Sequence, residues 1–427
     1  MGDQAEKAAP RSSRGPRAWW ILLGLIVGLI GGTLVAKSGD GLREPMIQVA
    51  SIVGTLWLNA LKMTVIPLIV ALLVSGIART ADAARGGRIA ALSVATFLGI
   101  FLCSATLGAF FTPVLTNLFP LPASAAEAMQ AGLASIDASS TSAVVPKAED
   151  FVRNIVPSNV IAAASNGDVL PLVMFTLLFA LAVTRIGEQP RRSLVGLFEG
   201  LADALLVVIR WVLAIAPLGV LALAFVLGAS AGGGAFAALA YYILLVSSIG
   251  LIVTIAAYPV AVIAGGRRLG EFARAMIAPQ SVAVSTRSSL ASLPAMLTAA
   301  RSLKIREEVV DVTLPMAVAL FRATGPAMNL AVLFYIAEWM GIEPSLPHAI
   351  AAIFVAVLMS LSAVSLPGEI SFVSSIAPIG IALGIPLGPL ALLIAVEMVP
   401  DIIRTLGNVT MDVAVTSAVD RRTAPES

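Results

Sequence analysis

A polar stripe lies inside an apolar segment near the C-terminal end of the chain. Its members are Glu397, Asp401, Arg404, Thr405, Asn408 and Asp412. Successive members are separated by four, three, one, three and four positions. These steps place them on one face of a helix with about 3.6 residues per turn. A guanidinium binds a carboxylate through two parallel hydrogen bonds, and a carboxylate binds an ammonium group. The stripe therefore predicts a binding site for a zwitterion, in which Arg404 faces a carboxylate and Asp401 faces an amino group.

The composition places this stripe in a membrane. Of the 427 residues, 58% are hydrophobic and only 12% are charged, whereas soluble domains carry about 25% charged residues. We therefore expect an integral membrane protein. A single Cys and a single His exclude a disulfide framework and a His-based catalytic or metal cluster. Because the Arg and Lys residues lie in short gaps between apolar blocks, no extended basic surface is available for nucleic acid.

Apolar runs long enough for a span of about 20 residues predict transmembrane segments at 19–36, 47–78, 88–118, 158–185, 198–228 and 235–265. Basic residues concentrate in the N-terminal tail and in alternate gaps, which hold Arg79, Arg85 and Arg88, then Arg185, Arg191 and Arg192, then Arg267, Arg268 and Arg274. Cytoplasmic loops carry the excess of Lys and Arg. The pattern therefore predicts cytoplasmic termini.

The pattern changes in the C-terminal region, 268–418. A basic group formed by Arg301, Lys304 and Arg306 follows Arg268 too closely for a full span to separate the two. A re-entrant hairpin that enters and leaves on the cytoplasmic side explains both, with its tip within 285–294. A related string at 362–368 matches this tip in step at Ser, Leu and Pro positions. Two broken hairpins in corresponding positions predict an inverted-repeat transporter; the alternative is that Ser and Pro merely kink two ordinary spans.

Two further cations, Arg287 and Arg322, are expected to be buried. Charged side chains inside a membrane span are costly enough to be functional by default. The alternative is that the charges only hold a helix bundle, pairing Asp401 with Arg404 and Glu397 with Arg322. Because desolvation can exceed the attraction within a buried ion pair, we favour the functional interpretation.

Several motifs, in order and at matching spacing, resemble the glutamate transporter family, the dicarboxylate/amino acid:cation symporters. The resemblance runs over about residues 47–418 and rests on the segments 61–68, 155–159, 164–171, 216–220, 285–289 and 401–412. It implies an all-α polytopic membrane fold with eight transmembrane helices, two re-entrant helical hairpins and inverted repeats. It also implies an elevator-type transporter that forms a homotrimer.

The same resemblance implies a division of the chain. Spans one and two (19–87), with the polar loop and spans four and five (119–234), would form a fixed scaffold. Span three (88–118) and the region 235–418 would form the moving transport domain, with span six, hairpin one, span seven, hairpin two and span eight. The short tails, 1–18 and 419–427, would be cytoplasmic.

Residue roles also follow from the resemblance, by position. Asp401 would take the substrate amino group and Arg404 its side-chain carboxylate, while Arg287 would reach from the first hairpin toward Asp401. The rest of the substrate site would comprise Ser288, Ser289, Gly325, Leu366 through its backbone, Thr405 and Asn408. Retention of Asp401 favours an amino acid over a plain dicarboxylate, because a plain dicarboxylate has no ammonium group.

The chain departs from the family in span seven. The family's Asn-Met-Asp-Gly-Thr signature falls on residues 321–325, which are Phe, Arg, Ala, Thr and Gly. The signature's Asn and Asp, which are cation ligands, become the apolar Phe321 and Ala323. Its Met becomes Arg322, and its final Thr, a substrate contact, becomes Gly325.

We hypothesise that Arg322 occupies the region of the coupling sodium, so that transport is sodium-independent. Glu397 and Glu369 then become candidates for proton coupling, because burial favours the neutral form of a carboxyl group. The alternative is a sodium-coupled protein in which Arg322 only pairs with Glu397 or Asp412. In that case Asn408 and Asp412 would supply the oxygens for sodium.

The sequence as a whole predicts a secondary active transporter for an acidic amino acid, with no cofactor beyond H⁺ or Na⁺ as coupling ion. Its partners would be the substrate, membrane lipid and other subunits of a homotrimer. An Ala-rich composition in which Arg outnumbers Lys suggests a bacterial plasma membrane. The alternatives are a sodium-coupled carrier of a dicarboxylate or neutral amino acid, and a transport-incompetent receptor. An enzyme is not expected, because no nucleophile–base pair or metal cluster is evident.

Overall fold

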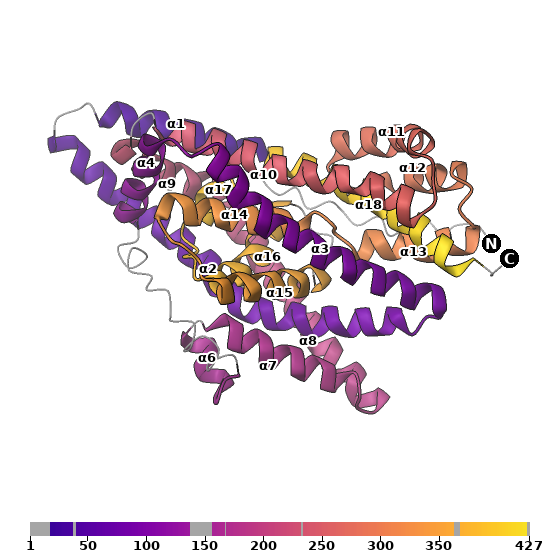
Figure 1. Cartoon of the computed structure of the whole chain (residues 1–427). Coiled ribbons are helices and arrows are strands. Elements are labelled where there is room, and N and C mark those ends of the chain that lie inside the picture. Colours follow the sequence, from indigo (N-terminus) through magenta and orange to yellow (C-terminus); the bar gives the residue numbers. More distant parts are fainter. Residues whose placement is uncertain are drawn as a thin grey trace, which may run out of the picture.

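A computed structural model describes residues 18–36, 40–136, 156–166, 168–231, 234–362 and 368–424. The described residues form helices joined by turns and short extended segments (Figure 1). The N-terminal half contains α1 (Ala18–Val35), α2 (Asp40–Ala84), α3 (Arg88–Leu118), α4 (Ala123–Ile136), α6 (Val160–Asn166), α7 (Val169–Val183), α8 (Glu188–Ala214) and α9 (Ala216–Ala231).

The C-terminal half continues with α10 (Gly234–Pro259), the π-helical turn η2 (Val260–Ala264), α11 (Leu269–Thr286), α12 (Ser289–Ser302), α13 (Glu307–Leu320), α14 (Gly325–Met340), α15 (Leu346–Ser362), α16 (Gly368–Leu383), α17 (Leu390–Leu393) and α18 (Met398–Thr423). The described part of the chain is therefore all-α, as the sequence predicted.

Several of these helices can cross a membrane by length and apolar composition. Four qualify among the described residues, at Arg43–Ala84, Arg88–Leu118, Gly234–Ala264 and Glu307–Met340, and the bent pair α8 and α9 adds a fifth. Large apolar side chains such as Leu56, Phe110 and Ile263 point away from the protein, as lipid-facing positions require. The protein is therefore a polytopic membrane protein, while the count of eight spans and two re-entrant hairpins stays a prediction.

The predicted spans differ in detail from the helices. The prediction for 88–118 coincides with α3, and that for 235–265 corresponds to α10 with η2. The predicted span 158–185 is two helices, α6 and α7, and 198–228 falls on α8 and α9, which meet at 57°. Pro217, in the first turn of α9, explains this bend, because it lacks an N–H and cannot continue the preceding helix.

Close helix packing joins α1 to α9. Three glycines of α1, Gly24, Gly28 and Gly32, lie against the backbone of α9, where a Cβ atom would collide with carbonyl oxygens of that helix. Small residues at this spacing let two membrane helices approach closely. Helix α2 packs on the same assembly through α7, α8 and α9, so this half forms one connected bundle.

A helical hairpin lies where the sequence predicted the first re-entrant hairpin. Helices α11 and α12 pack against each other and are joined at Arg287 and Ser288, within the predicted tip. Arg287 has a φ of 52°, the left-handed conformation that reverses the chain. In the second pair, α15 packs against α16 (Figure 1), and the connecting residues 363–367 lie outside the described part of the chain.

The two ends of the first hairpin meet at Asp420, near the end of α18. Arg267, before α11, donates to its carboxylate at 2.5 Å, and Arg306, after α12, donates to it at 2.8 Å. Arg267 also donates to the carbonyl oxygen of Leu303 at 2.7 Å. The two basic groups that the sequence placed on one side of the membrane therefore come together on one side of the molecule.

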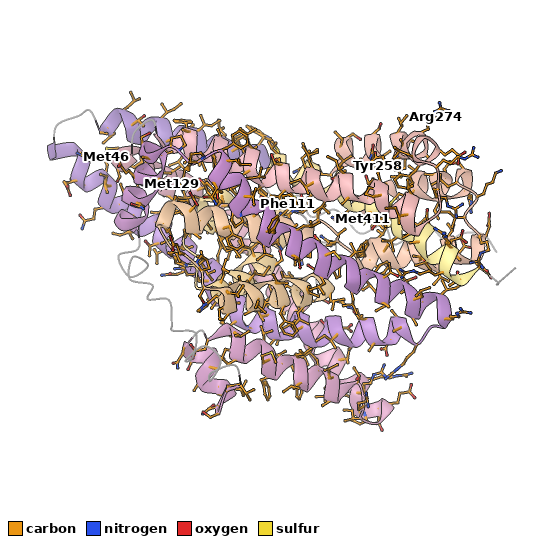
Figure 2. The ribbon with its side chains drawn as sticks, viewed as in Figure 1. Met46, Phe111, Met129, Tyr258, Arg274 and Met411 are labelled. Carbon is orange, nitrogen blue, oxygen red and sulfur yellow. The ribbon has the colours of Figure 1, made fainter. Side chains whose placement is uncertain are left out.

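The first hairpin, formed by α11 and α12, also contacts α10 and α18 through one polar side chain. Gln280 of α11 donates from its amide nitrogen to the hydroxyl oxygens of Tyr258, at 3.1 Å, and Thr410, at 3.0 Å. Tyr258 belongs to α10 and Thr410 to α18, and the labelled Tyr258 and Met411 mark this part of the molecule in Figure 2. Three elements are therefore tied together by one side chain.

Candidate functional site

The polar stripe of α18 faces the protein interior, as predicted. Glu397 is the N-cap residue of this helix. Asp401, Thr405, Asn408 and Asp412 are buried, and Asp412 has no solvent exposure. The stripe contacts the broken span formed by α13 and α14, whose helices are separated by the non-helical segment 321–324, and the hairpin tip at Arg287. These three elements enclose the candidate site.

Arg404 is paired with Glu397. Its Nη2 donates to Oε1 of Glu397 at 2.8 Å, and its Nη1 donates to Oδ1 of Asn329, on α14, at 3.0 Å. The second carboxylate oxygen of Glu397 accepts from the hydroxyl of Tyr242, on α10, at 2.7 Å. Both oxygens of this buried carboxylate are therefore hydrogen-bonded. The structure pairs Glu397 with Arg404, where the salt-bridge alternative had paired it with Arg322.

Arg287 reaches Asp401, as the resemblance implied. Its Nη1 lies 3.8 Å from Oδ2 of Asp401, and both side chains are partly shielded from solvent. Beside it, Ser288 caps α12, with its hydroxyl accepting from the backbone N–H of Ala291 at 3.2 Å, and Ser289 is the first residue of that helix. The hairpin tip thus brings one cation and two partly buried serines to the N-terminal part of α18.

Asn408 is held by the non-helical segment of the broken span. Its Oδ1 accepts from the backbone N–H of Thr324 at 3.0 Å and lies 2.8 Å from the Thr324 hydroxyl. An amide oxygen has two lone pairs. The backbone N–H occupies one of them, and the single proton of the Thr324 hydroxyl is also within reach of the Arg404 carbonyl oxygen, at 3.0 Å. Gly407 permits this approach, because a Cβ there would collide with the Thr324 methyl group. Thr405 bonds within its own helix, donating to the Asp401 carbonyl at 2.9 Å.

Asp412 is a fully buried carboxyl group. Neither of its oxygens has a hydrogen-bond partner among the described residues. An ionised carboxylate away from water is costly unless a cation or donor compensates it. Arg322, on the non-helical segment, is a cation that interacts with Asp412 electrostatically.

Arg322 lies in the non-helical segment and is partly buried. It interacts electrostatically with Arg404, Asp401 and Asp412. Gly325, which begins α14, lies close by, and a Cβ added there would be 3.6 Å from the Ser360 hydroxyl and 3.8 Å from the Arg322 Cβ. The replaced signature residues therefore lie in the centre of the site.

Among the described residues, the site contains equal numbers of basic and acidic side chains. The described residues contribute three cations and three anions that interact with one another, namely Arg287, Arg322 and Arg404 with Glu397, Asp401 and Asp412. The formal charge of this group is zero when all six are ionised.

Some predicted site residues are not described. Leu366 lies outside the described residues, as does the side chain of Glu369, which is the second residue of α16. Conversely, the sequence did not single out Tyr242, Thr324 or Asn329, which hold the stripe in place. Asn329 is a polar residue in an otherwise apolar run, and that signal could have identified it.

Comparison with known families agrees with this architecture. The model of a family described as the sodium:dicarboxylate symporter family matches residues 18–422. The chain belongs to the sodium:dicarboxylate symporter family. Members of this family are transporters, so the protein is not an enzyme.

Curated relatives of this symporter family cover nearly all of the chain. A proton/glutamate-aspartate symporter of Escherichia coli is 28% identical over 92% of this chain and 89% of its own. A proton/sodium-glutamate symport protein of Bacillus subtilis is 29% identical over 91% and 89%. A C4-dicarboxylate transport protein of Solibacter usitatus is 25% identical over 92% and 88%.

Proposed function

We propose that this protein is a secondary active transporter that moves an acidic amino acid without sodium as its coupling ion. The substrate class is supported by Asp401 and Arg404, one turn apart on the buried face of α18. Relatives named for glutamate and aspartate transport point the same way. Asp401 would bind the amino group, and Arg404 the distal carboxylate.

The single observation that carries sodium independence is the relationship of Asp412 to Arg322. Asp412 is fully buried, its oxygens lack hydrogen-bond donors among the described residues, and Arg322 interacts with it electrostatically. A guanidinium that is fixed to the chain at this position would replace the positive charge of a bound cation. The amide oxygen of Asn408 supports the same view, because the backbone N–H of Thr324 already occupies one of its two lone pairs.

We also propose the domain division, assembly and membrane orientation that the family resemblance implies. The regions 19–87 and 119–234 would form the scaffold, and the regions 88–118 and 235–418 the domain that moves as an elevator. Each subunit of a homotrimer would work alone, with the hairpin tips predicted within 285–294 and at 362–368 as gates and backbone near Leu366 completing the pocket. The protein would lie in a bacterial plasma membrane with both termini cytoplasmic.

A sodium-coupled carrier is the second candidate. The two unpartnered oxygens of Asp412 favour it, because carboxylate oxygens are the ligands that a hard cation prefers. In that case the charge of Arg322 would compensate only Asp401. A dicarboxylate or a neutral amino acid could then be the substrate.

Uptake of labelled aspartate into proteoliposomes tests the proposal. The conditions are an inward sodium gradient, an inward proton gradient, and exchange against internal aspartate without a gradient. Uptake under the second or third condition, with no sodium present, is the expected result. A strict sodium requirement would overturn sodium independence. Aspartate binding without uptake under any condition would instead indicate a receptor.

A further inference from the structure

We propose that a cluster of arginines where α2, α7 and α8 meet binds an anionic phospholipid. The phosphate group would lie among the guanidinium groups, and the acyl chains would run along α7. This inference is independent of the proposed substrate and coupling ion, because none of these three helices carries the polar stripe.

The arginine cluster is assembled at or next to the ends of four helices, α2, α3, α7 and α8. Its members are Arg79, Arg85, Arg88, Arg185, Arg191 and Arg192. Arg85 donates to the carbonyl oxygen of Thr184 at 3.0 Å, which attaches the end of α2 to the turn after α7. Arg191 of α8 forms an ion pair with Asp82 of α2. The turn from α2 to α3 lies at the same end of the molecule as the end of α18 (Figure 1), the end that the sequence predicts to be cytoplasmic.

The cluster contains more guanidinium groups than its carboxylates can pair. Among the described residues, Asp82 pairs with Arg85, at 3.4 Å, and with Arg191, while Glu188 pairs with Arg192. The other three arginines form no ion pair within the described part of the chain, and they are Arg79, Arg88 and Arg185. The surface therefore keeps an excess of positive charge, which favours an anionic partner.

Arg79 adds a more specific observation. It lies about one turn before Asp82 on α2, and its Nε is buried without a hydrogen-bond partner among the described residues. Buried donors are almost always paired. A phosphate oxygen that enters between the guanidinium groups would supply this acceptor, because phosphate and guanidinium match in charge and hydrogen-bond geometry.

An exposed apolar stripe continues from the cluster along α7. Leu178 and Leu181 are 57% and 48% exposed, and their spacing of three residues places them on one side of the helix. Thr184 keeps a helical conformation after the last residue of α7, so the exposed Arg185 follows about one turn beyond Leu181. A cation at the membrane surface above exposed leucines matches a phospholipid, whose phosphate group lies above its acyl chains. A free phosphate ion would make no use of the leucines.

The experiment measures lipid binding to the purified full-length protein in an uncharged detergent. Phosphatidylglycerol and phosphatidylcholine with the same acyl chains are titrated separately, and inorganic phosphate is tested as a competitor. We expect phosphatidylglycerol to bind about tenfold more tightly than phosphatidylcholine, with a preference that falls as salt is raised. Phosphate at the same concentration should not displace the lipid. Equal Kd values for the two lipids, or displacement by phosphate, would overturn the inference.

A double variant, Arg79→Gln with Arg185→Gln, tests the cluster itself. It removes two cations that pair with no described carboxylate, so the Tm in phosphatidylcholine should stay at the wild-type value while the preference for phosphatidylglycerol falls about tenfold. Arg185→Gln alone alters an exposed side chain only, and it should lower the preference about threefold even if the double variant folds poorly. Arg274→Gln, on α11 and labelled in Figure 2, is the matched control, because it removes an exposed cation outside the cluster. An equal loss in this control would assign the preference to overall charge and overturn the site.

A variant of the apolar stripe distinguishes a lipid from another subunit. Leu181→Gln should weaken the binding of phosphatidylglycerol and leave the mass of the purified assembly unchanged. A changed mass with unaltered lipid binding would show that this face is a contact between copies of the chain, and would overturn the lipid site.

Discussion

Thr324 contacts Asn408 twice, through its backbone N–H at 3.0 Å and its hydroxyl at 2.8 Å from the same amide oxygen. The Thr324 hydroxyl also lies 3.0 Å from the carbonyl oxygen of Arg404. The non-helical segment between α13 and α14 is therefore fastened to the centre of α18. Arg322 is two residues away on the same segment. The contact therefore also fixes the backbone position from which the Arg322 side chain extends.

Replacing Thr324 by Val tests this attachment. The change removes the hydroxyl at nearly constant volume and leaves Asn408 with one donor, so we expect a loss of about 1–3 kcal/mol in stability and weaker uptake. Thermal unfolding and aspartate uptake measure the two effects. Thr298→Val, on the exposed face of α12, is the matched control and should behave as wild type. Equal behaviour of the two variants would contradict the assigned contact.

Replacing Arg322 by Met should leave Asp412 as an uncompensated buried charge. We expect a destabilisation of about 3–5 kcal/mol and either no uptake or uptake that now needs sodium. The double variant Arg322→Met with Asp412→Asn should recover most of the stability, because no buried charge then lacks a partner. Thermal unfolding of the single and double variants measures this coupling. Additive losses in the double variant would exclude a direct electrostatic role for Arg322.

Replacing Arg287 by Ala should affect substrate binding more than stability. Its contact with Asp401 is long, at 3.8 Å, and its side chain is about one-third exposed, so the pair contributes at most about 1 kcal/mol. The expected result is a raised KM for aspartate with little change in Tm. Arg301→Ala removes a comparable surface pair with Glu307, at 3.3 Å, and should leave KM unchanged. A large fall in Tm for Arg287→Ala alone would assign this residue to folding.

Replacing Gly407 by Ala should disturb the site without changing any charge. The added methyl group would meet the side chains of Thr324 and Thr254, and overpacking of this kind costs about 1–3 kcal/mol. Gly270→Ala on α11 is the control, because nothing lies within 4 Å of its added Cβ and Ala favours a helix over Gly by about 1 kcal/mol. We expect lower Tm and uptake only for Gly407→Ala, and equal Tm values would contradict the close approach.

The sequence predicted those features that depend on local order. The limits of α3, the turn at Arg287 and the burial of the α18 stripe follow from hydropathy, turn residues and helical spacing, and all three are present. The bend between α8 and α9 was missed, although Pro217 marks it. Apolar composition identifies a membrane segment but does not report where its axis changes direction.

The partners of the charged residues could not be predicted from spacing. Helical periodicity shows which residues share a face, but it gives no distance to residues of other helices. Glu397 and Arg404 lie two turns apart on one face, and their pairing depends on Tyr242 and Asn329, which come from α10 and α14. The interaction of Arg322 with Asp412 likewise depends on how the chain leaves α13.

The contacts of Asp420 have a mechanical consequence. Because Arg267 and Arg306 both form ion pairs with this residue, the base of the first hairpin is attached to the end of α18. Any displacement of the tip relative to α18 must then be absorbed by bending along the two arms. Each arm contains a proline, Pro279 in α11 and Pro294 in α12, and each proline removes one backbone hydrogen bond. The first hairpin is thus stiff at its root and most compliant partway along its length.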